Sequence, residues 1–334
     1  MIIEEYDLVI IGAGISGLAL GKALSNSSIN FKIFDKSRGL GGRAATRRVN
    51  AQPIDTGAQY FTVSNPLFKK EVEELIQRGT VKLWTNKLNV WDGEKLLFEG
   101  NSNPRYVCPK GFTDISKEFA KVLPVSREIK ITKAARVNGL WELKTDKMVE
   151  LKAKRVVSTA PLPQSLELFG SYLSVEQKAS LSTISFNPCL SIVIVFNKLV
   201  SLPFKGVFWN NREVLSWVAN DSSKRLNATS SVLVVQCQPK FSGRFFESSD
   251  SEILEKVFNE FKVLLPQVAL SNKDLQEVQV KKWRYSQPAA IYEHQYFATE
   301  DKSLYFTGDW SLEGKIEGAY MAGLGLAKNL LKVF

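Results

Sequence analysis

The sequence has one histidine and three cysteines among its 334 residues, and both scarcities restrict its chemistry. With His294 alone we can assemble no Ser-His-Asp set, and a lone histidine is more often structural than catalytic. Cys108, Cys189 and Cys237 are far apart and odd in number, which argues against a disulfide framework and a Cys/His metal site. We therefore expect no metal, reduced thiols and a cytoplasmic location.

Long apolar runs are absent as well, and no run reaches the ~18 residues of a spanning helix. The N-terminus, MIIEEYD, is acidic and leads at once into a strand, so we expect no signal peptide and no membrane partner. The net charge is +10, but no nucleic-acid module or basic-aromatic cluster accompanies it. The charge fits either a solvated surface or an electropositive site for an anionic ligand.

The first 43 residues contain the strongest motif of the chain. They read strand, glycine turn, helix, strand and acid, at residues 8–11, 12–17, 18–24, 31–34 and 35. Gly12 permits a tight turn, Gly14 lets a pyrophosphate approach the backbone, and Gly17 lets the helix pack on the strand. Asp35 follows at the distance expected of a ribose-binding acid, so this context predicts a bound dinucleotide.

A second glycine-rich turn, Lys36 to Arg43, suggests a cofactor that extends beyond the first nucleotide unit. The segment DTGAQYFT follows at residues 55–62. Together, GxGxxG, the GGR turn and DTGAQYFT resemble the flavin-containing amine oxidase superfamily, most of all its renalase-like branch. The resemblance covers nearly the whole chain and implies FAD as the cofactor. No cysteine lies beyond Cys237, so we expect FAD to be bound non-covalently.

The C-terminal block, residues 304–321, also resembles these flavoproteins, in which a helix start lies against the pyrimidine end of the flavin. A helix N-terminus stabilises the negative charge that reduced flavin carries near N1. The motifs and the resemblance together give these expected cofactor-binding residues: Gly12, Gly14, Ile15, Ser16, Gly17, Asp35, Lys36, Gly42, Arg43, Ala58, Gln59, Tyr60, Phe61, Gly308, Asp309, Glu317, Gly318 and Ala319.

Two further segments resemble substrate-side sequences of the renalase-like branch. Residues 217–225, WVANDSSKR, are similar to WxAxNSSKPGR, but Asp221 replaces an asparagine and Arg225-Leu226 replaces Pro-Gly. Residues 283–288 are similar to WRYxxP. The expected substrate-pocket residues are Tyr60, Trp217, Asn220, Trp283 and Arg284, with Lys224 as a further polar contact. An ordinary solvated loop and a packed strand with an exposed Arg284 remain the alternatives.

The resemblance implies an α/β fold: a Rossmann-like FAD-binding domain of the GR2 type, and an α+β substrate domain on a mostly antiparallel sheet. We expect the FAD-binding domain to be discontinuous and to comprise residues 1–75, 104–160 and 286–334. The substrate domain would then comprise residues 76–103 and 161–285. The flavin ring is expected at the junction of the two domains, where pockets commonly form.

No side chain is expected to be catalytic, because the flavin would carry the redox chemistry. The resemblance implies oxidation of dihydronicotinamide isomers, 2- or 6-dihydro-NAD(P), to NAD(P)⁺. A hydride would pass to flavin N5, and O₂ would accept the electrons and give H₂O₂. The substrate would be a small molecule, expected to be a nucleotide. The alternatives are a flavin oxidase or desaturase of an amine or another small or apolar substrate, and a flavin-binding protein without turnover.

Overall fold

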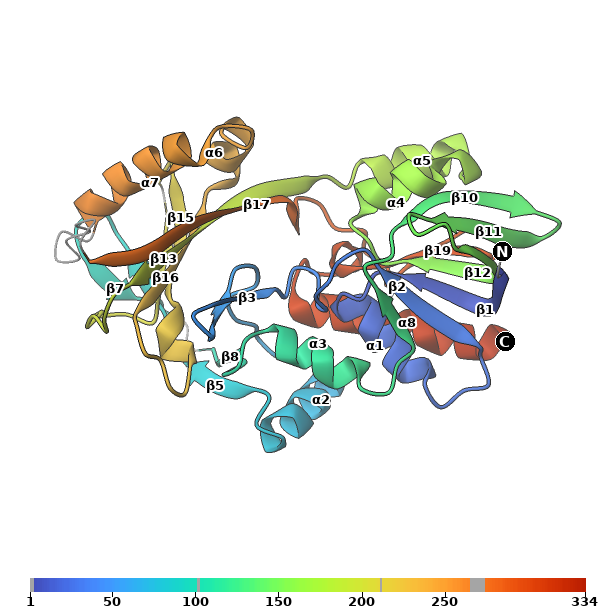
Figure 1. The fold of residues 1–334 in the computed structure, drawn as a ribbon, viewed down its shortest axis with the longest axis horizontal. Coiled ribbons are helices and arrows are strands. Elements are labelled where there is room, and N and C mark those ends of the chain that lie inside the picture. The colour runs from blue at the N-terminus through green and yellow to red at the C-terminus, as the bar shows by residue number, and fades with distance from the viewer. Residues whose placement is uncertain (1–2, 101–102, 211, 265–273) are drawn as a thin grey trace.

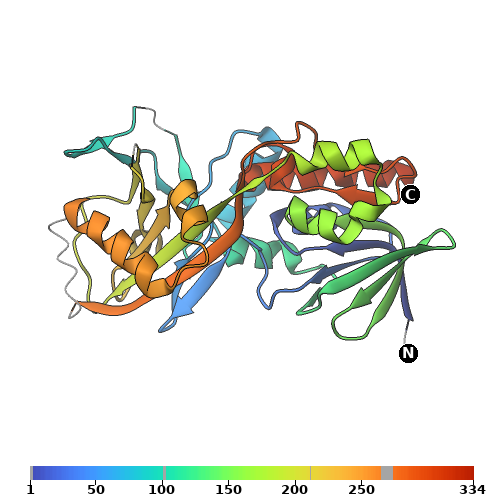
Figure 2. The same cartoon turned by 90° about the horizontal axis from the view of Figure 1, so that it is seen from above.

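The computed structural model describes residues 3–100, 103–210, 212–264 and 274–334, which form two lobes side by side (Figures 1 and 2). Each lobe is built on one large sheet. Both ends of the chain lie in the lobe that contains β1 (Ile3–Ile11) and α8 (Ile316–Val333). Within the described ranges, every helix is too short or too polar to span a bilayer.

The first lobe contains an eight-stranded sheet with parallel strands at its centre. Its strands are β1, β2 (Phe31–Asp35), β9 (Val125–Arg127), β10 (Ile131–Val137), β11 (Leu140–Thr145), β12 (Glu150–Ser158), β18 (Phe297–Ala298) and β19 (Leu304–Phe306). β1 lies between β2 and β12 and is parallel to both. Leu8, Val9 and Ile10 are fully buried, as expected for a parallel strand that is covered on both faces.

Helices cover both faces of this sheet. Leu8 and Ile10 share a core with α1 (Ile15–Leu24), α2 (Pro66–Gln77), α3 (Thr113–Ala120) and α8. Val9 points the other way because side chains alternate along a strand. It shares a second core with α4 (Leu162–Phe169) and α5 (Val175–Ser182), which are joined by the short 3-10 helix η1 (Gly170–Tyr172).

The second lobe contains a seven-stranded, mostly antiparallel sheet in the order β17-β13-β16-β15-β14-β6-β7. These strands are β6 (Asn89–Trp91), β7 (Leu96–Phe98), β13 (Phe186–Phe196), β14 (Gly206–Trp209), β15 (Leu215–Asn220), β16 (Val232–Cys237) and β17 (Leu275–Pro288). Helices α6 (Pro239–Arg244) and α7 (Asp250–Leu264) cover one face, and Ile253, Val257 and Phe261 of α7 are fully buried there.

The opposite face of this second sheet packs on two small two-stranded sheets in the middle of the molecule (Figure 1). They are β3 (Thr46–Val49) with β4 (Gln52–Asp55), and β5 (Lys82–Thr85) with β8 (Arg105–Val107). Ile54 and Trp84 contact the Val193 side of β13 within one apolar cluster. The segment that follows β4, residues 55–61, is thereby held against both lobes.

The expected α/β class with a second, mostly antiparallel sheet is confirmed. Asn138 and Gly139 form the β10–β11 turn, at φ +48° and +79°, as an Asn-Gly pair between two strands favours. The first helix begins earlier than predicted, at Ile15, because the glycine turn leads directly into it. The domain boundaries stay a prediction.

Candidate functional site

The turn between β1 and α1 has the geometry that the glycine motif predicts. Gly12 has φ +107°, and a Cβ on Gly17 would lie 2.0 Å from the Gly12 carbonyl oxygen. Space beside Gly14 is open, since no heavy atom lies within 4 Å of the position a Cβ would take. Ile15 is buried beneath the turn, and no described side chain caps the helix. The N–H groups of the first turn of α1 are thus available to an anion.

Asp35 stabilises the same turn. Its carboxylate accepts the Ala13 N–H at 2.6 Å and the Ser37 N–H at 2.7 Å. Each oxygen keeps a second lone pair for a ribose hydroxyl. The Ser16 hydroxyl is buried and has no hydrogen-bond partner among the described residues. A buried hydroxyl without a partner costs stability, so its place beside the open glycine turn fits a polar cofactor group.

The second glycine turn lies against the first. Gly14 and Gly41 form a parallel bridge, and Gly42 lies so close that its Cβ would be 3.6 Å from the Gly14 Cα. Gly41 and Gly42 have φ +98° and +57°. Two backbone walls without side chains therefore face each other, which fits the predicted dinucleotide. Lys36 lies at the surface and donates to Gln164 at 3.1 Å.

Arg43 joins segments that are far apart in the sequence. Its two Nη atoms donate to the two carboxylate oxygens of Asp309, each at 2.7 Å, and Nη1 also donates to the Ser286 carbonyl at 3.2 Å. Gly308 precedes this acid at the start of η3 (Asp309–Ser311). The fork geometry makes this a strong pair. In the structure Arg43 holds the C-terminal block against the second glycine turn.

The start of α8 is fixed through Glu317. Its buried carboxylate accepts the Ser64 N–H at 2.9 Å, the Ser64 hydroxyl at 2.8 Å and the Asn65 N–H at 2.5 Å. Gly318 and Ala319 follow in the first turn, and Gly318 lines a cavity of about 550 Å³. Glu317 therefore anchors the loop before α2 in the structure, and its role toward the cofactor stays a prediction.

Tyr60 and Phe61 point in opposite directions. Phe61 is buried in the first lobe, with its ring 6.1 Å from that of Phe112. Tyr60 points to the second lobe, where its ring centre lies 5.5 Å from Trp217 and 6.4 Å from Trp84. Burial raises the pKa of the Tyr60 hydroxyl. We call Tyr60, Trp84 and Trp217 the aromatic wall.

Ala58 is held by a backbone hydrogen bond, and Gln59 is held by hydrogen bonds of its side chain. The Ala58 N–H donates to the Arg43 carbonyl at 3.0 Å. The Gln59 Nε2 donates to the Asp55 carbonyl at 2.6 Å, and its Oε1 accepts from Lys224 Nζ at 3.0 Å. Gln59 thus has one orientation, fixed from both ends.

Lys224 belongs to a fully buried group of charges that the sequence did not reveal. We call Asp55, Asp221, Lys224 and Arg225 the buried ion cluster. Lys224 Nζ lies 3.0 Å from Asp221 Oδ1, and Arg225 Nη2 lies 2.6 Å from Asp221 Oδ2 and 2.8 Å from Asp55 Oδ2. Arg225 Nη1 also donates to the Cys108 carbonyl at 2.9 Å. The cluster joins β4 to the short 3-10 helix η2 (Asp221–Lys224).

The pKa values of the two acids in the cluster shift in opposite directions. Burial, aided by the neighbouring charge of Asp221, raises the pKa of Asp55 despite the opposing charge of Arg225. Burial alone would raise the pKa of Asp221. The positive charges of Lys224 and Arg225 have the larger effect, so the pKa of this acid is lowered. Two cations and two carboxylates balance formally, which is how buried charges are tolerated.

Trp217 and Asn220 lie on β15, beside this cluster. Trp217 is buried in the aromatic wall, and its Nε1 has no partner among the described residues. Asn220 uses its side-chain oxygen to accept the Ser223 N–H at 3.3 Å, which caps η2. Asn220 is therefore occupied locally in the structure, while Trp217 is brought next to Tyr60.

Trp283 and Arg284 point to opposite faces of β17, as successive strand residues must. Trp283 Nε1 donates to the Thr56 carbonyl at 2.9 Å, on the side of the first lobe. Arg284 pairs with Glu247 at 2.6 Å and stacks over Phe246, on the α6 side. The structure thus brings Trp283 to residues 55–61 but not Arg284, so we leave Arg284 out of the proposed site.

A model of the flavin-containing amine oxidoreductase family matches residues 126–331, and a model of an NAD(P)-binding Rossmann-like domain matches residues 10–77. The chain is 26% identical over 301 residues to renalase from Mus musculus, covering 84% of each chain. It is 23% identical to polyamine oxidase 5 from Oryza sativa subsp. japonica, covering 96% of this chain and 87% of that one.

Solved structures show the same fold at low identity. A putative protoporphyrinogen oxidase from Exiguobacterium sp. 255-15 superposes with a TM-score of 0.77 at 14% identity, covering 99% of both chains. A putrescine oxidase triple mutant superposes with a TM-score of 0.78 at 12% identity, covering all of both chains. The family model spans more than half of the sequence. The chain therefore belongs to the flavin-containing amine oxidoreductase family and is an FAD-dependent oxidoreductase.

Proposed function

We propose that this protein oxidises dihydronicotinamide isomers, 2- or 6-dihydro-NAD(P), to NAD(P)⁺ with O₂ as the acceptor. FAD, when bound, would supply the redox chemistry, as acceptor of the substrate hydride at N5 and as donor of two electrons and a proton to O₂, which with one further proton from solvent gives H₂O₂. The observation that carries the proposal is the aromatic wall, in which Tyr60 of the segment at residues 55–62, expected near the flavin, packs beside Trp84 and Trp217. The match to renalase over most of both chains supports the same substrate class.

The aromatic wall suits a planar heteroaromatic ring. Tyr60 is fixed between Trp84 and Trp217, and the Arg105 guanidinium lies 5.8 Å from the Tyr60 ring. Rigid aromatic side chains bind flat rings with little loss of conformational entropy. Trp84 and Trp217 are almost fully buried, so the wall is held rigidly by the packing around it. A dihydropyridine gives up its hydride without losing a proton, so this reaction requires no side-chain base.

The charges around the junction favour an anionic substrate over a polyamine. Lys281 lies over the Trp283 ring at 5.3 Å, and Arg47 donates to Gln279 at 2.7 Å on the same side of β17. Lys205 donates to the Trp84 carbonyl at 2.7 Å. A polycation would be repelled by these side chains, whereas a nucleotide carries phosphates that they attract.

The chain's own residues position the cofactor and order the site. We assign the glycine turns and the N-terminus of α1 to the pyrophosphate, and Asp35 to the ribose. The Arg43–Asp309 pair holds the C-terminal block in place, and the start of α8 is assigned to the pyrimidine end of the flavin. The buried ion cluster fixes Gln59, and with it the segment next to the flavin ring.

The proposal is tested by measuring H₂O₂ formation by the FAD-saturated protein with four substrates: 2-dihydro-NADP, 6-dihydro-NADP, ordinary NADPH and putrescine. We expect turnover with one or both isomers and little with NADPH or putrescine. Turnover of putrescine alone would make the protein an amine oxidase and contradict the proposal. If none of the four compounds reacts, two alternatives remain: an oxidase of an apolar substrate, or a flavin-binding protein without turnover.

A further inference from the structure

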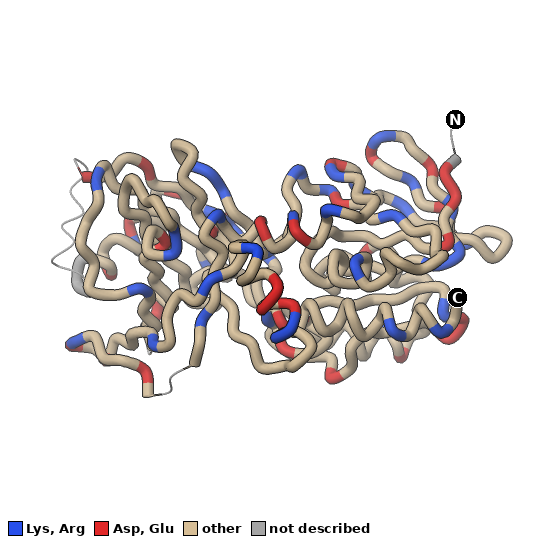
Figure 3. The backbone as a smooth tube through the Cα atoms, turned by 90° about the horizontal axis from the view of Figure 1, so that it is seen from below, with Lys and Arg blue, Asp and Glu red and all other residues tan. Residues whose placement is uncertain are grey.

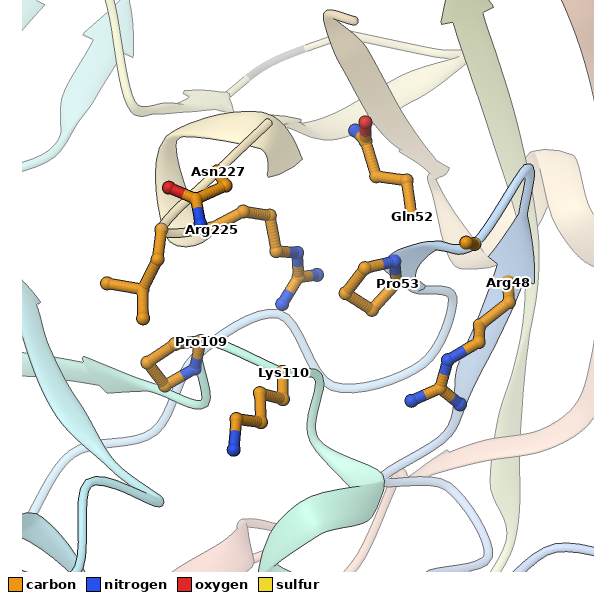
Figure 4. Close-up of a pocket in the computed structure, with 9 residues that line it drawn as sticks. Arg48, Gln52, Pro53, Pro109, Lys110, Arg225 and Asn227 are labelled. Atoms are coloured by element: carbon orange, nitrogen blue, oxygen red, sulfur yellow. The ribbon is translucent and has the colours of Figure 1, made fainter. Parts of the chain in front are cut away.

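We propose that a basic hollow on the far side of β4 binds the phosphate groups of the nucleotide substrate. The hollow, a cavity of about 310 Å³, lies where three segments meet: the β3–β4 turn, the loop after β8 and the end of η2. Figure 4 shows Arg48, Lys110 and Arg225 entering from these three segments. The inference rests on the proposed function only in naming the source of the phosphate.

The hollow carries surplus positive charge. None of its 9 lining residues is acidic. Arg225 is neutralised by the buried ion cluster, but among the described residues no carboxylate pairs with Arg48 or Lys110. Their two charges are therefore available to a ligand. Basic and acidic positions are distributed along the chain in both lobes (Figure 3).

Lys82 is a further basic group near Arg225, outside the lining of the hollow. Burial lowers the pKa of Lys82 most, and the charges of Arg225 and Lys205 lower it further. Like charges disfavour one another, and an anion bound nearby would offset their repulsion.

The hollow is also preformed. The β3–β4 turn is formed by Asn50 and Ala51, which have φ +48° and +66°. The left-handed conformation costs an alanine about 1 kcal/mol, and such cost is often retained where a binding site needs the backbone shape. Gln52 fixes the turn from the other side, because its Nε2 donates to the Ser230 carbonyl at 3.1 Å.

The hollow and the aromatic wall are joined by one continuous stretch of chain. Pro53 lines the hollow, and Tyr60 follows seven residues later in the segment expected near the flavin. Seven extended residues span at most about 25 Å. The assignment therefore requires a dinucleotide with its nicotinamide ring near Tyr60 to extend along this segment, so that its diphosphate reaches the hollow.

The test uses the FAD-saturated protein and the double variant Arg48→Gln/Lys110→Gln. The matched control is Lys133→Gln/Lys147→Gln, which removes the same charge from exposed positions in the first lobe. Calorimetric titration with ADP and with pyrophosphate measures the site directly. Kinetics with 6-dihydro-NADP and with the phosphate-free dihydronicotinamide riboside show whether the substrate uses it. Flavin content and melting temperature check that each variant is folded.

We expect the double variant to bind ADP and pyrophosphate at least about tenfold more weakly, since each lost charge-assisted bond is worth about that factor. The KM for 6-dihydro-NADP should rise by a similar factor, with kcat and the riboside kinetics unchanged. Weaker pyrophosphate binding with an unchanged nucleotide KM would overturn the assignment to the substrate. Unchanged ADP and pyrophosphate binding would refute the site. If no dihydronicotinamide compound is turned over, the proposed function fails, and the titration still decides whether the hollow binds phosphate.

Discussion

Replacing Lys224 by methionine tests whether the buried ion cluster holds the site together. The ammonium is fully buried and lies 3.0 Å from Asp221 Oδ1 and 3.0 Å from Gln59 Oε1. Methionine is of similar length, so the change removes the charge more than the packing volume. The variant leaves Asp55 and Asp221 with Arg225 alone, which means one uncompensated negative charge in the interior.

Removing one partner of a buried ion pair costs about 3–5 kcal/mol. For a chain of this size, the melting temperature should fall by about 2 °C per kcal/mol, so by about 6–10 °C. The double variant Lys224→Met/Asp221→Asn is neutral again and should recover more than half of the loss. Lys205→Met is the matched control: Lys205 is exposed and its Nζ donates to one carbonyl, so its loss should cost about 1 kcal/mol or less.

The pH dependence gives a second, independent readout of the Lys224→Met variant. Without Lys224 the pKa of Asp55, already raised in the folded state, rises further, and the pKa of Asp221 loses the larger of the two charges that lower it. The folded state then binds more protons than the unfolded state in this interval, so stability falls as pH rises through it. The difference from the wild type should grow from acid toward neutral pH.

The assay is thermal and urea unfolding with saturating FAD, followed by circular dichroism and flavin fluorescence. Flavin absorbance of the folded variant should also shift, because Gln59 loses its lysine donor. A Lys224→Met variant within about 1 kcal/mol of the wild type would refute the reasoning. A double variant as unstable as the single one would show that the cluster is not electrostatically coupled.

Three further predictions concern the cofactor site and the thiols. Gly17→Ala should abolish FAD retention, because its Cβ would lie 2.0 Å from a carbonyl oxygen; Gly39→Ala, with open space around it, should purify with full flavin content. Arg43→Gln leaves Asp309 without its forked partner and should weaken FAD binding about tenfold in a fluorescence titration, and unchanged affinity would argue against this clamp. Burial raises the pKa of Cys189 to about 12, so the native protein should show no rapidly reacting thiol at about pH 8, and three after unfolding.

Local patterns made the first third of the site predictable. The β1 turn, α1 and β2 are contiguous, and a left-handed Gly12 followed by a closely packed Gly17 has a recognisable spacing. The Asn138-Gly139 hairpin follows from the same kind of local rule. Arg284 could have been left out of the expected pocket, because successive side chains of a strand point to opposite faces and Trp283 precedes it.

The long-range contacts were not predictable from one sequence. Asp55 meets Arg225 across 170 positions, and no local period links them. The spacing of Asp221, Lys224 and Arg225 hints at ion pairs within one turn, but only the fold shows that the turn is buried. Such contacts depend on how the two sheets pack on residues 55–61, which the local sequence does not specify.

The most direct test of the central claim is a single anaerobic turnover followed by flavin absorbance. The protein is mixed in the absence of oxygen with purified 2- or 6-dihydro-NADP, and putrescine serves as the comparison. Bleaching of the flavin bands by an isomer within seconds, with NADP⁺ formed in equal amount and recovery of the bands on adding O₂, is the predicted result. Flavin bands that persist with both isomers but bleach with putrescine would contradict the account.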